Sequence, residues 1–134
     1  MGRSTERQRD LAQAVAAVDR ELAANLELTS VFDQTKQAFV LENGQWQVHR
    51  STIADELPAA HAFVDELYRR IPDAESAMER RGPANSLKDA DREIVEAWEG
   101  DAREAQRRLR ADLVRPEPPV PVRLARRIAR LVGR

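Results

Sequence analysis

The sequence of 134 residues contains no cysteine, only five glycines and only six aromatic side chains. Without cysteine, disulfide bridges and thiolate metal sites are excluded, and a reducing compartment is compatible with the chain. No window approaches the run of about eighteen apolar residues that a membrane-spanning helix needs. The polar start, MGRSTERQRD, lacks the apolar segment of a secretory signal. We therefore expect a cytoplasmic protein, with a peripheral membrane location as the alternative.

Signals for catalysis are equally scarce. The glycines are scattered, so no phosphate-binding glycine loop is present, and no serine nucleophile is flanked by glycines. His61 and Asp65 stand one helical turn apart and suit a metal site or a base with its orienting carboxylate. We favour a plainer interpretation, in which they form a partly exposed surface pair. We therefore expect no catalytic residue, no metal and no cofactor, and an enzyme built around His61 is the outlier.

The residues that are abundant favour helices. Ala, Leu, Arg and Glu dominate the composition. Apolar residues at spacings of four, three and four predict an amphipathic helix that begins near Ser4 and extends to about residue 41. A break within LELTS, residues 26–30, is the alternative. The apolar residues that define this stripe are Leu11, Val15, Val18 and Leu22.

Asn25 falls close to the seam of this first helix. A buried Asn at such a position fixes helix register or oligomeric state at some cost in stability. The alternative, which we favour, is that the seam shifts by one residue and uses Leu26. Asn25 is therefore a candidate determinant of register or oligomeric state.

Residues 39–48 allow two interpretations. Asn43-Gly44 suits a type I′ hairpin turn, which would place Phe39 and Val48 on one face. The same pair suits the end of the first helix, with glycine in the left-handed cap position. We favour the helix end, because the pattern before it is helical and no other strand is predicted to extend a sheet.

Two prolines divide the middle of the chain. Ser51 or Thr52 is predicted to start the next helical stretch, and Pro58 has to lie in a first turn. A second apolar stripe follows, and Pro72 ends or kinks this helix before a short continuation, DAESAMERR. The apolar residues of this stripe are Ala60, Phe63, Val64, Leu67, Tyr68 and Ile71.

A long helix is predicted from about residue 86 to 114, with Ser86 and Asp89 resembling a capping box. Trp98 lies in its apolar stripe, and we expect both Trp98 and Trp46 to pack in the core. The fold class is therefore all-α: a small antiparallel bundle of three to four helices over residues 1–114. The apolar stripe of the long helix is Leu87, Ile94, Trp98, Ala102, Ala105, Leu109 and Leu113.

The charge is unevenly distributed along the chain. Six of the 22 basic residues and one of the 23 acidic residues lie in residues 115–134, which gives this tail a charge of +5. The remaining 16 basic and 22 acidic residues give residues 1–114 a charge of −6. Residues 115–121, RPEPPVP, are predicted to form a Pro-rich spacer with polyproline II geometry. The tail is thus set apart from the body both by charge and by a semi-rigid segment.

Residues 122–134, which we call the arm, are predicted to form a basic amphipathic helix. At about 100° per residue, the apolar side chains cover one half of the helical wheel and five arginines cover the other. A helix this short is marginal alone in water, so its apolar half needs a cover. The residues expected to contact that cover are Arg123, Leu124, Arg126, Arg127, Ile128, Arg130, Leu131 and Val132.

Three covers are considered for the arm. The first is a protein, either the acidic body itself or a second chain, and we favour it. The second is an anionic membrane surface, to which each arginine contributes about 1 kcal/mol. The third is nucleic acid, which would leave the apolar half uncovered. The sequence thus predicts a non-enzymatic interaction module or assembly subunit whose arm docks on a protein partner, with a peripheral membrane adaptor as the alternative.

Overall fold

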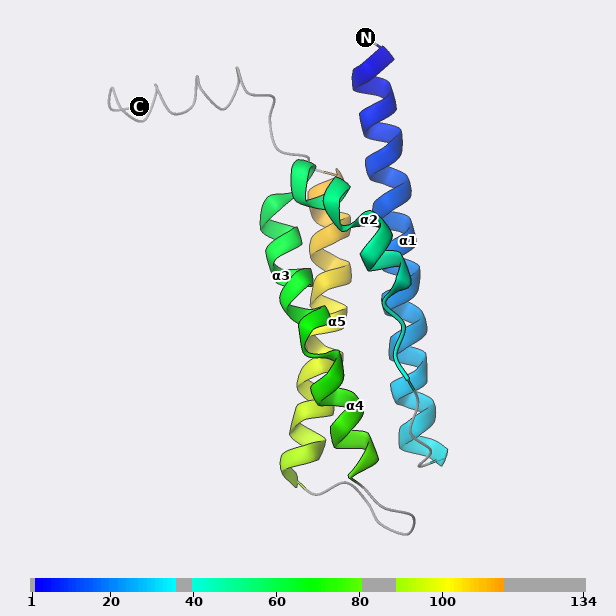
Figure 1. Cartoon of the computed structure of the whole chain (residues 1–134), viewed down its shortest axis with the longest axis vertical. Helices are drawn as coiled ribbons and strands as arrows, with labels where there is room; N and C mark the ends of the chain where they lie inside the picture. Colours follow the sequence, from blue (N-terminus) through cyan, green and yellow to red (C-terminus); the bar gives the residue numbers. More distant parts are fainter. Residues whose placement is uncertain (1, 36–39, 81–88, 115–134) are drawn as a thin grey trace, which may run out of the picture.

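The computed structural model describes residues 2–35, 40–80 and 89–114, and the elements within these ranges are all helices (Figure 1). The predicted all-α fold class is therefore confirmed. The spacer and the arm lie outside the described residues. The helices are α1 (Gly2–Thr35), α2 (Gly44–Glu56), α3 (Pro58–Arg69), α4 (Ile71–Glu79) and α5 (Asp89–Val114).

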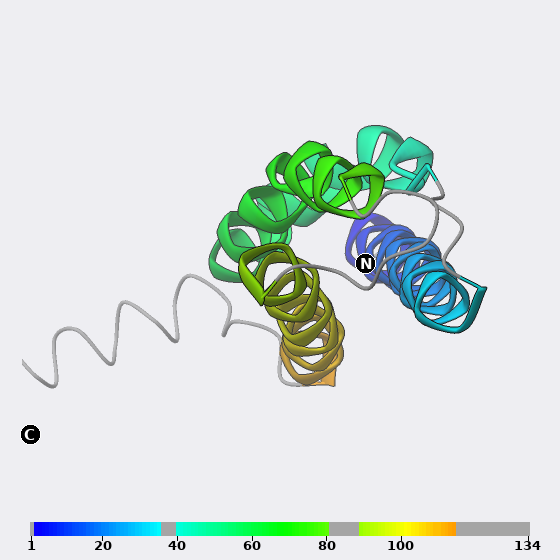
Figure 2. The same ribbon diagram turned by 90° about the horizontal axis from the view of Figure 1, so that it is seen from below.

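The helices form three columns (Figures 1 and 2). Helix α1 is one column, α5 is the second, and α3 followed by α4 is the third. Helix α2 lies between α1 and α3 and packs on both, while α5 packs on α1, α3 and α4. The two long helices run in opposite directions, because residue 19 of α1 meets residue 110 of α5 and residue 29 meets residue 99. The bundle is therefore antiparallel, as predicted.

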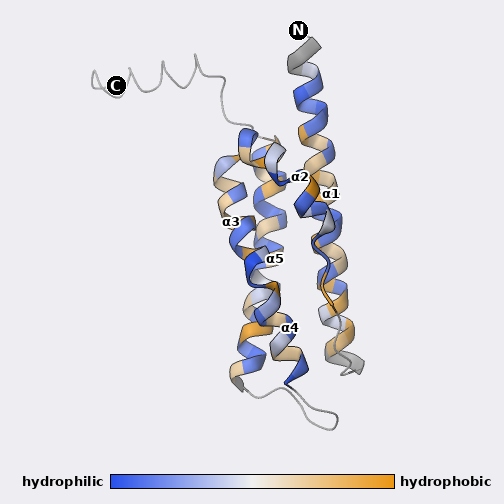
Figure 3. Ribbon diagram, viewed as in Figure 1, coloured by the Kyte–Doolittle hydropathy of each residue, from blue (hydrophilic) through white to orange (hydrophobic). Residues whose placement is uncertain are grey.

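One core joins all five helices. Hydrophilic and hydrophobic residues alternate along the columns in Figure 3, as amphipathic helices require. All four residues of the predicted α1 stripe are buried, and both tryptophans are only 1 % exposed. The largest buried side chains, which fix the positions of the columns, are Trp46, Trp98, Phe32, Leu22, Ile53, Leu57, Leu67, Met78 and Leu109.

The two prolines act as predicted. Pro58 stands in the first turn of α3, and Pro72 stands in the first turn of α4. Pro72 has no N–H to donate to the preceding turn, so α3 ends at Arg69 and α4 starts a new helix. The carbonyl of Leu67 near this break accepts the indole N–H of Trp98 on α5 at 3.0 Å. The break therefore gives α5 an attachment point on the third column.

The structure overturns both interpretations of Asn43-Gly44. This pair neither ends the first helix nor turns a hairpin: α1 ends at Thr35, and Gly44 begins α2. Helix α2 therefore starts seven or eight residues before the predicted start at Ser51 or Thr52. The Asn43 side chain makes no capping bond. The partner that does bind this helix end comes from α1, which explains why the local sequence did not indicate it.

Within the described part of α5, the stripe is shifted from the prediction at one position, while Ser86 and Leu87 of the predicted helix lie outside the described residues. Ile94 is 36 % exposed, and Val95 is buried in its place. Trp98, Ala102 and the other central residues of the stripe are buried as expected, while Leu113 is half-buried. Among the described residues, no helix is long and apolar enough to cross a membrane.

Candidate functional site

An extended segment, residues 40–43, leads into α2 and lies against the middle of α1. Asn25 on α1 is completely buried and holds this segment through two hydrogen bonds. Its amide nitrogen donates to the carbonyl of Glu42 at 2.8 Å, and its amide oxygen accepts the Glu42 N–H at 2.7 Å. The side chain thus pairs with the backbone of residue 42 in both directions, as a neighbouring strand would.

Glu21, one turn before Asn25, binds the start of α2. Its Oε2 accepts the backbone N–H of Gln45 at 2.8 Å, and its Oε1 accepts that of Trp46 at 3.1 Å. These N–H groups belong to the first turn of α2, where a helix has no internal acceptors for them. A negative side chain at this end also interacts favourably with the helix dipole. Glu21 therefore caps α2 from a different helix.

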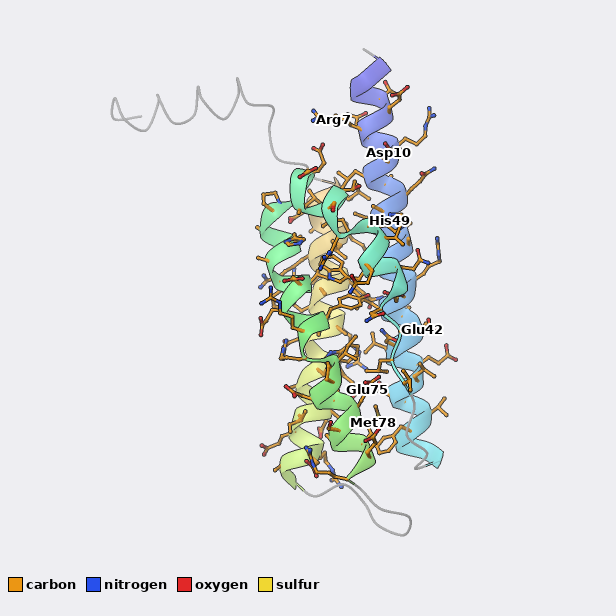
Figure 4. The ribbon with its side chains drawn as sticks, in the orientation of Figure 1. Arg7, Asp10, Glu42, His49, Glu75 and Met78 are labelled. Atoms are coloured by element: carbon orange, nitrogen blue, oxygen red, sulfur yellow. The ribbon has the colours of Figure 1, made fainter. Side chains whose placement is uncertain are left out.

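A third side chain, from α4, holds the other end of the segment. The carboxylate of Glu75 accepts the N–H of Leu41 at 2.7 Å. Figure 4 shows Glu42 on the extended segment and Glu75 on α4, across the space between α1 and α4. The Leu41 side chain is buried in the core. Residues 41–46 are thus attached to two columns of the bundle, and we call this stretch the joint.

Trp46 anchors the joint in the core. Its ring stacks between Tyr68 and His61 of α3, with centroid distances of 5.2 and 5.3 Å. The hydroxyl of Tyr68 donates to Glu21 Oε1 at 2.9 Å. Burial, the negative charge of Glu21 and this hydrogen bond together hold the pKa of Tyr68 far above its usual range. One carboxylate therefore links α1, α2 and α3.

The joint forms one wall of a groove on the surface of the protein, with a volume of about 820 Å³. We call this the α1 groove. Helix α1 forms its other wall, and side chains of Ala17 and Ala24 and residue Gly44 keep it open because they are small. Val40 stands at its edge and is 81 % exposed. The residues lining the groove are Ala17, Arg20, Glu21, Ala24, Val40, Leu41, Glu42, Asn43, Gly44 and Gln45.

The groove edges carry charges of both signs. Glu42 is exposed on the joint side, and Arg20 is exposed on the α1 side. Glu27 lies one turn beyond Ala24 on α1 and is also exposed. Glu21 also lines the groove but is buried, and its carboxylate is already bound to the joint. The exposed charged residues of the lining itself are therefore one acidic residue, Glu42, and one basic residue, Arg20.

The two residues of the proposed histidine site, one turn apart on α3, have different partners in the structure. His61 stacks on Trp46, and Asp65 pairs with Arg69 at 3.0 Å. Within the described ranges, no group of three His, Asp or Glu side chains is placed to hold a metal ion. The contacts do not show the plainer interpretation, a surface pair of His61 with Asp65, either: the His61 ring is a packing surface for Trp46 of the joint.

Our preference for Leu26 in the α1 seam is wrong. Asn25 occupies the interior and Leu26 is only partly buried, because the two bonds to Glu42 satisfy a polar side chain there. Asn25 thus binds the backbone of the joint, while its proposed role in register or oligomeric state stays a prediction. The predicted arm contacts, Arg123, Leu124, Arg126, Arg127, Ile128, Arg130, Leu131 and Val132, lie outside the described residues.

Sequence analysis did not predict Glu21, Glu75 or the groove. The only available signal was the position of Glu21 beside Leu22 in the buried stripe of α1, where an acidic residue needs a partner. Searches against protein-family models, curated proteins and solved structures find no match to this chain. The candidate site is therefore argued from its own geometry.

Proposed function

We propose that this protein is a non-enzymatic interaction module or assembly subunit whose arm docks on a protein partner. The observation that carries the proposal is the separation of charge and apolar surface along the chain. Residues 1–114 carry −6, and the last twenty residues carry +5. Within the arm, every arginine lies on one half of the predicted helical wheel and every apolar side chain on the other.

The apolar half of the arm favours a protein over a purely ionic partner. Leu124, Ile128 and Leu131 fall close together on the wheel and would be left in water by a partner that binds only the arginines. Covering aliphatic side chains contributes about 25 cal/mol for each Å² removed from water. A partner with an apolar groove and acidic edges therefore fits the whole arm, whereas a phosphate backbone fits half of it.

The described body supports a scaffold role. Its buried polar side chains Glu21 and Asn25 are bound to the backbone of the joint, and its tryptophans are buried in the core. These groups fix the positions of the helices relative to one another. A rigid body of this kind presents the arm from one end of α5.

The test compares three full-length proteins as baits in a lysate of the source organism, with quantitative mass spectrometry. The first is the natural chain. The second carries Leu124→Gln, Ile128→Gln and Leu131→Gln, which keep the charge and the helix propensity but remove the apolar half. The third carries Arg126→Lys, Arg127→Lys and Arg130→Lys, which keep both charge and apolar half. The proposal predicts a protein captured by the first and third baits and lost from the second.

Equal capture by all three baits would contradict a role for the arm. The membrane adaptor is tested in parallel with vesicles that contain phosphatidylserine. If the natural chain sediments with these vesicles at low salt, and the glutamine variant and high salt both prevent it, the arm is a membrane anchor and the protein-partner proposal is wrong.

A further inference from the structure

We propose that, in the free protein, the apolar half of the arm occupies the α1 groove of its own chain. The proposal goes beyond the function above, since it concerns the protein without its partner. It commits to one occupant of the groove, residues 122–134, and gives the uncovered apolar half of the arm a place on the body. The reach of the chain, the size of the groove and the distribution of charge argue for it.

The chain beyond α5 is long enough to reach the groove. The contact of Asp19 with Arg110 places the end of α5, four residues later, near the level of residue 15 of α1. The groove begins at Ala17, so the end of α5 and the start of the groove are close along the bundle axis. The spacer of seven residues spans roughly 20 Å in polyproline II geometry, at about 3.1 Å per residue. A helix with its side chains is about 10–12 Å wide, so the spacer can cross α1.

The spacing of two small residues in the groove wall equals that of two large aliphatic residues of the arm. The small residues Ala17 and Ala24 are seven positions apart on α1, and Leu124 and Leu131 are seven positions apart on the arm. Seven residues of helix rise by about 10 Å, so the two pairs have the same spacing. Small residues on one helix let a second helix approach closely, and larger side chains fill the space between them. The exposed Val40 extends the apolar contact at the groove edge.

Charge favours the same placement. The arm brings five arginines to a body that carries −6. In the groove lining, Glu42 and Arg20 are the exposed charged residues, and Glu27 is exposed one turn beyond Ala24 on α1. Opposite charges at the edge of a contact guide association and orientation. The arginine half of the arm would face solvent and these carboxylates while its aliphatic half faces the groove.

The tether favours the same chain over a second copy. A semi-rigid connection that can span the distance holds the arm near its own groove and raises its effective concentration there. A second copy at lower concentration cannot compete with this unless geometry prevents the arm from folding back. The closed arrangement therefore predicts a monomeric mass in which the arm is already covered.

The test uses the absence of native cysteine. Gly133→Cys adds a single thiol at the end of the arm, outside the apolar stripe, and carries a nitroxide label on the full chain. Backbone amide signals of residues 17–24 and 40–45 should lose most of their intensity by paramagnetic broadening. Signals at the C-terminal end of α4, near Glu79, should keep their intensity. Reduction of the label should restore the lost signals.

Two matched variants connect the broadening to the groove. Val40→Lys places a positive charge at the exposed groove edge and should restore most of the intensity. Ala23→Lys adds the same charge to an exposed position of α1 that does not line the groove and should leave the broadening in place. Both positions are exposed, so neither variant removes core packing, and circular dichroism checks the fold.

The result that would overturn the proposal is unchanged intensity at the groove, or broadening that Val40→Lys does not reduce. A second version of the experiment mixes isotope-labelled protein without nitroxide with unlabelled protein that carries the nitroxide. Broadening in this mixture assigns the groove to a second copy and contradicts docking within one chain. Failure of the bait experiment leaves this result untouched, because no partner is present here.

Discussion

The joint and the outer surface of α5 are two regions in which polar side chains make contacts of opposite kinds. At the joint, Glu21, Asn25 and Glu75 are bound to backbone N–H or C=O groups of residues 41–46. On α5, arginines meet carboxylates in water, as in the pair of Arg110 with Asp19 and the contacts of Arg107 and Arg108 with Glu104.

This difference determines what each region contributes. An exposed ion pair adds between zero and about 1 kcal/mol, because water solvates both charges when they separate. A buried backbone N–H without an acceptor costs about 1–3 kcal/mol, because nothing replaces the lost partner. We therefore expect stability to depend on the joint and to be almost insensitive to the ion pairs of α5.

The largest effect is expected at the aromatic anchor of the joint. Trp46→Ala removes a ring that is 1 % exposed and stacks on two others. We expect the free energy of unfolding to fall by about 3–5 kcal/mol, measured by urea denaturation. A loss below about 1 kcal/mol would mean that the joint is not part of the cooperative core.

The second-largest loss of stability is expected at Glu21, the residue of α1 that caps α2. Glu21→Gln keeps the size of the side chain but replaces one acceptor oxygen by a donor and removes the charge, leaving acceptors too few for Gln45, Trp46 and Tyr68. A loss of about 1–3 kcal/mol is expected. Glu42→Gln is the control: this side chain is exposed, and only its backbone is bound, so the change should stay within about 0.5 kcal/mol. Equal effects of the two variants would break the contrast between buried and exposed carboxylates.

Alkaline pH should also act through the joint. The raised pKa of Tyr68 means that the folded protein keeps the phenol proton at pH values where the unfolded chain releases it. The stabilisation is complete below about pH 10, the usual tyrosine value, and decreases as the pH rises above it. Tyr68 is the only tyrosine, so tyrosinate absorbance reports it directly.

We expect this absorbance to appear only together with the loss of helical circular dichroism. Tyr68→Phe should remove most of the dependence of stability on pH above 10. Ionisation near pH 10 in a protein that stays helical would show that the phenol is accessible to water and would contradict the buried link to Glu21.

The smallest effect is expected for the exposed ion pair between Asp19 of α1 and Arg110 of α5. Asp19→Asn removes the charge opposite Arg110, whose side chain is 62 % exposed, and should cost less than about 1 kcal/mol in urea denaturation. The cost should fall further in high salt, which screens exposed pairs. A loss as large as that of Glu21→Gln would overturn the ranking of the two regions.

The same contrast explains what the sequence could predict. Helical spacing found the buried face of α1 at Leu11–Leu22, and proline chemistry found the starts of α3 and α4, since both signals are local. The start of α2 at Gly44 could not be found in this way, because its cap is Glu21, more than twenty residues earlier. Asn25 was a candidate from its seam position alone, but its partner in the backbone of Glu42 is a tertiary contact. The groove is formed by these tertiary contacts, so it could not be predicted from the sequence either.

Native-state hydrogen exchange at the joint tests most directly whether buried side chains fix this segment. Four amides matter, those of Leu41, Glu42, Gln45 and Trp46, all bound by side-chain oxygens. Two of these residues, Glu42 and Gln45, have exposed side chains. We predict that all four exchange only by global unfolding, with the same free energy as the urea measurement. Exchange of these amides on the timescale of free loop amides would contradict the account.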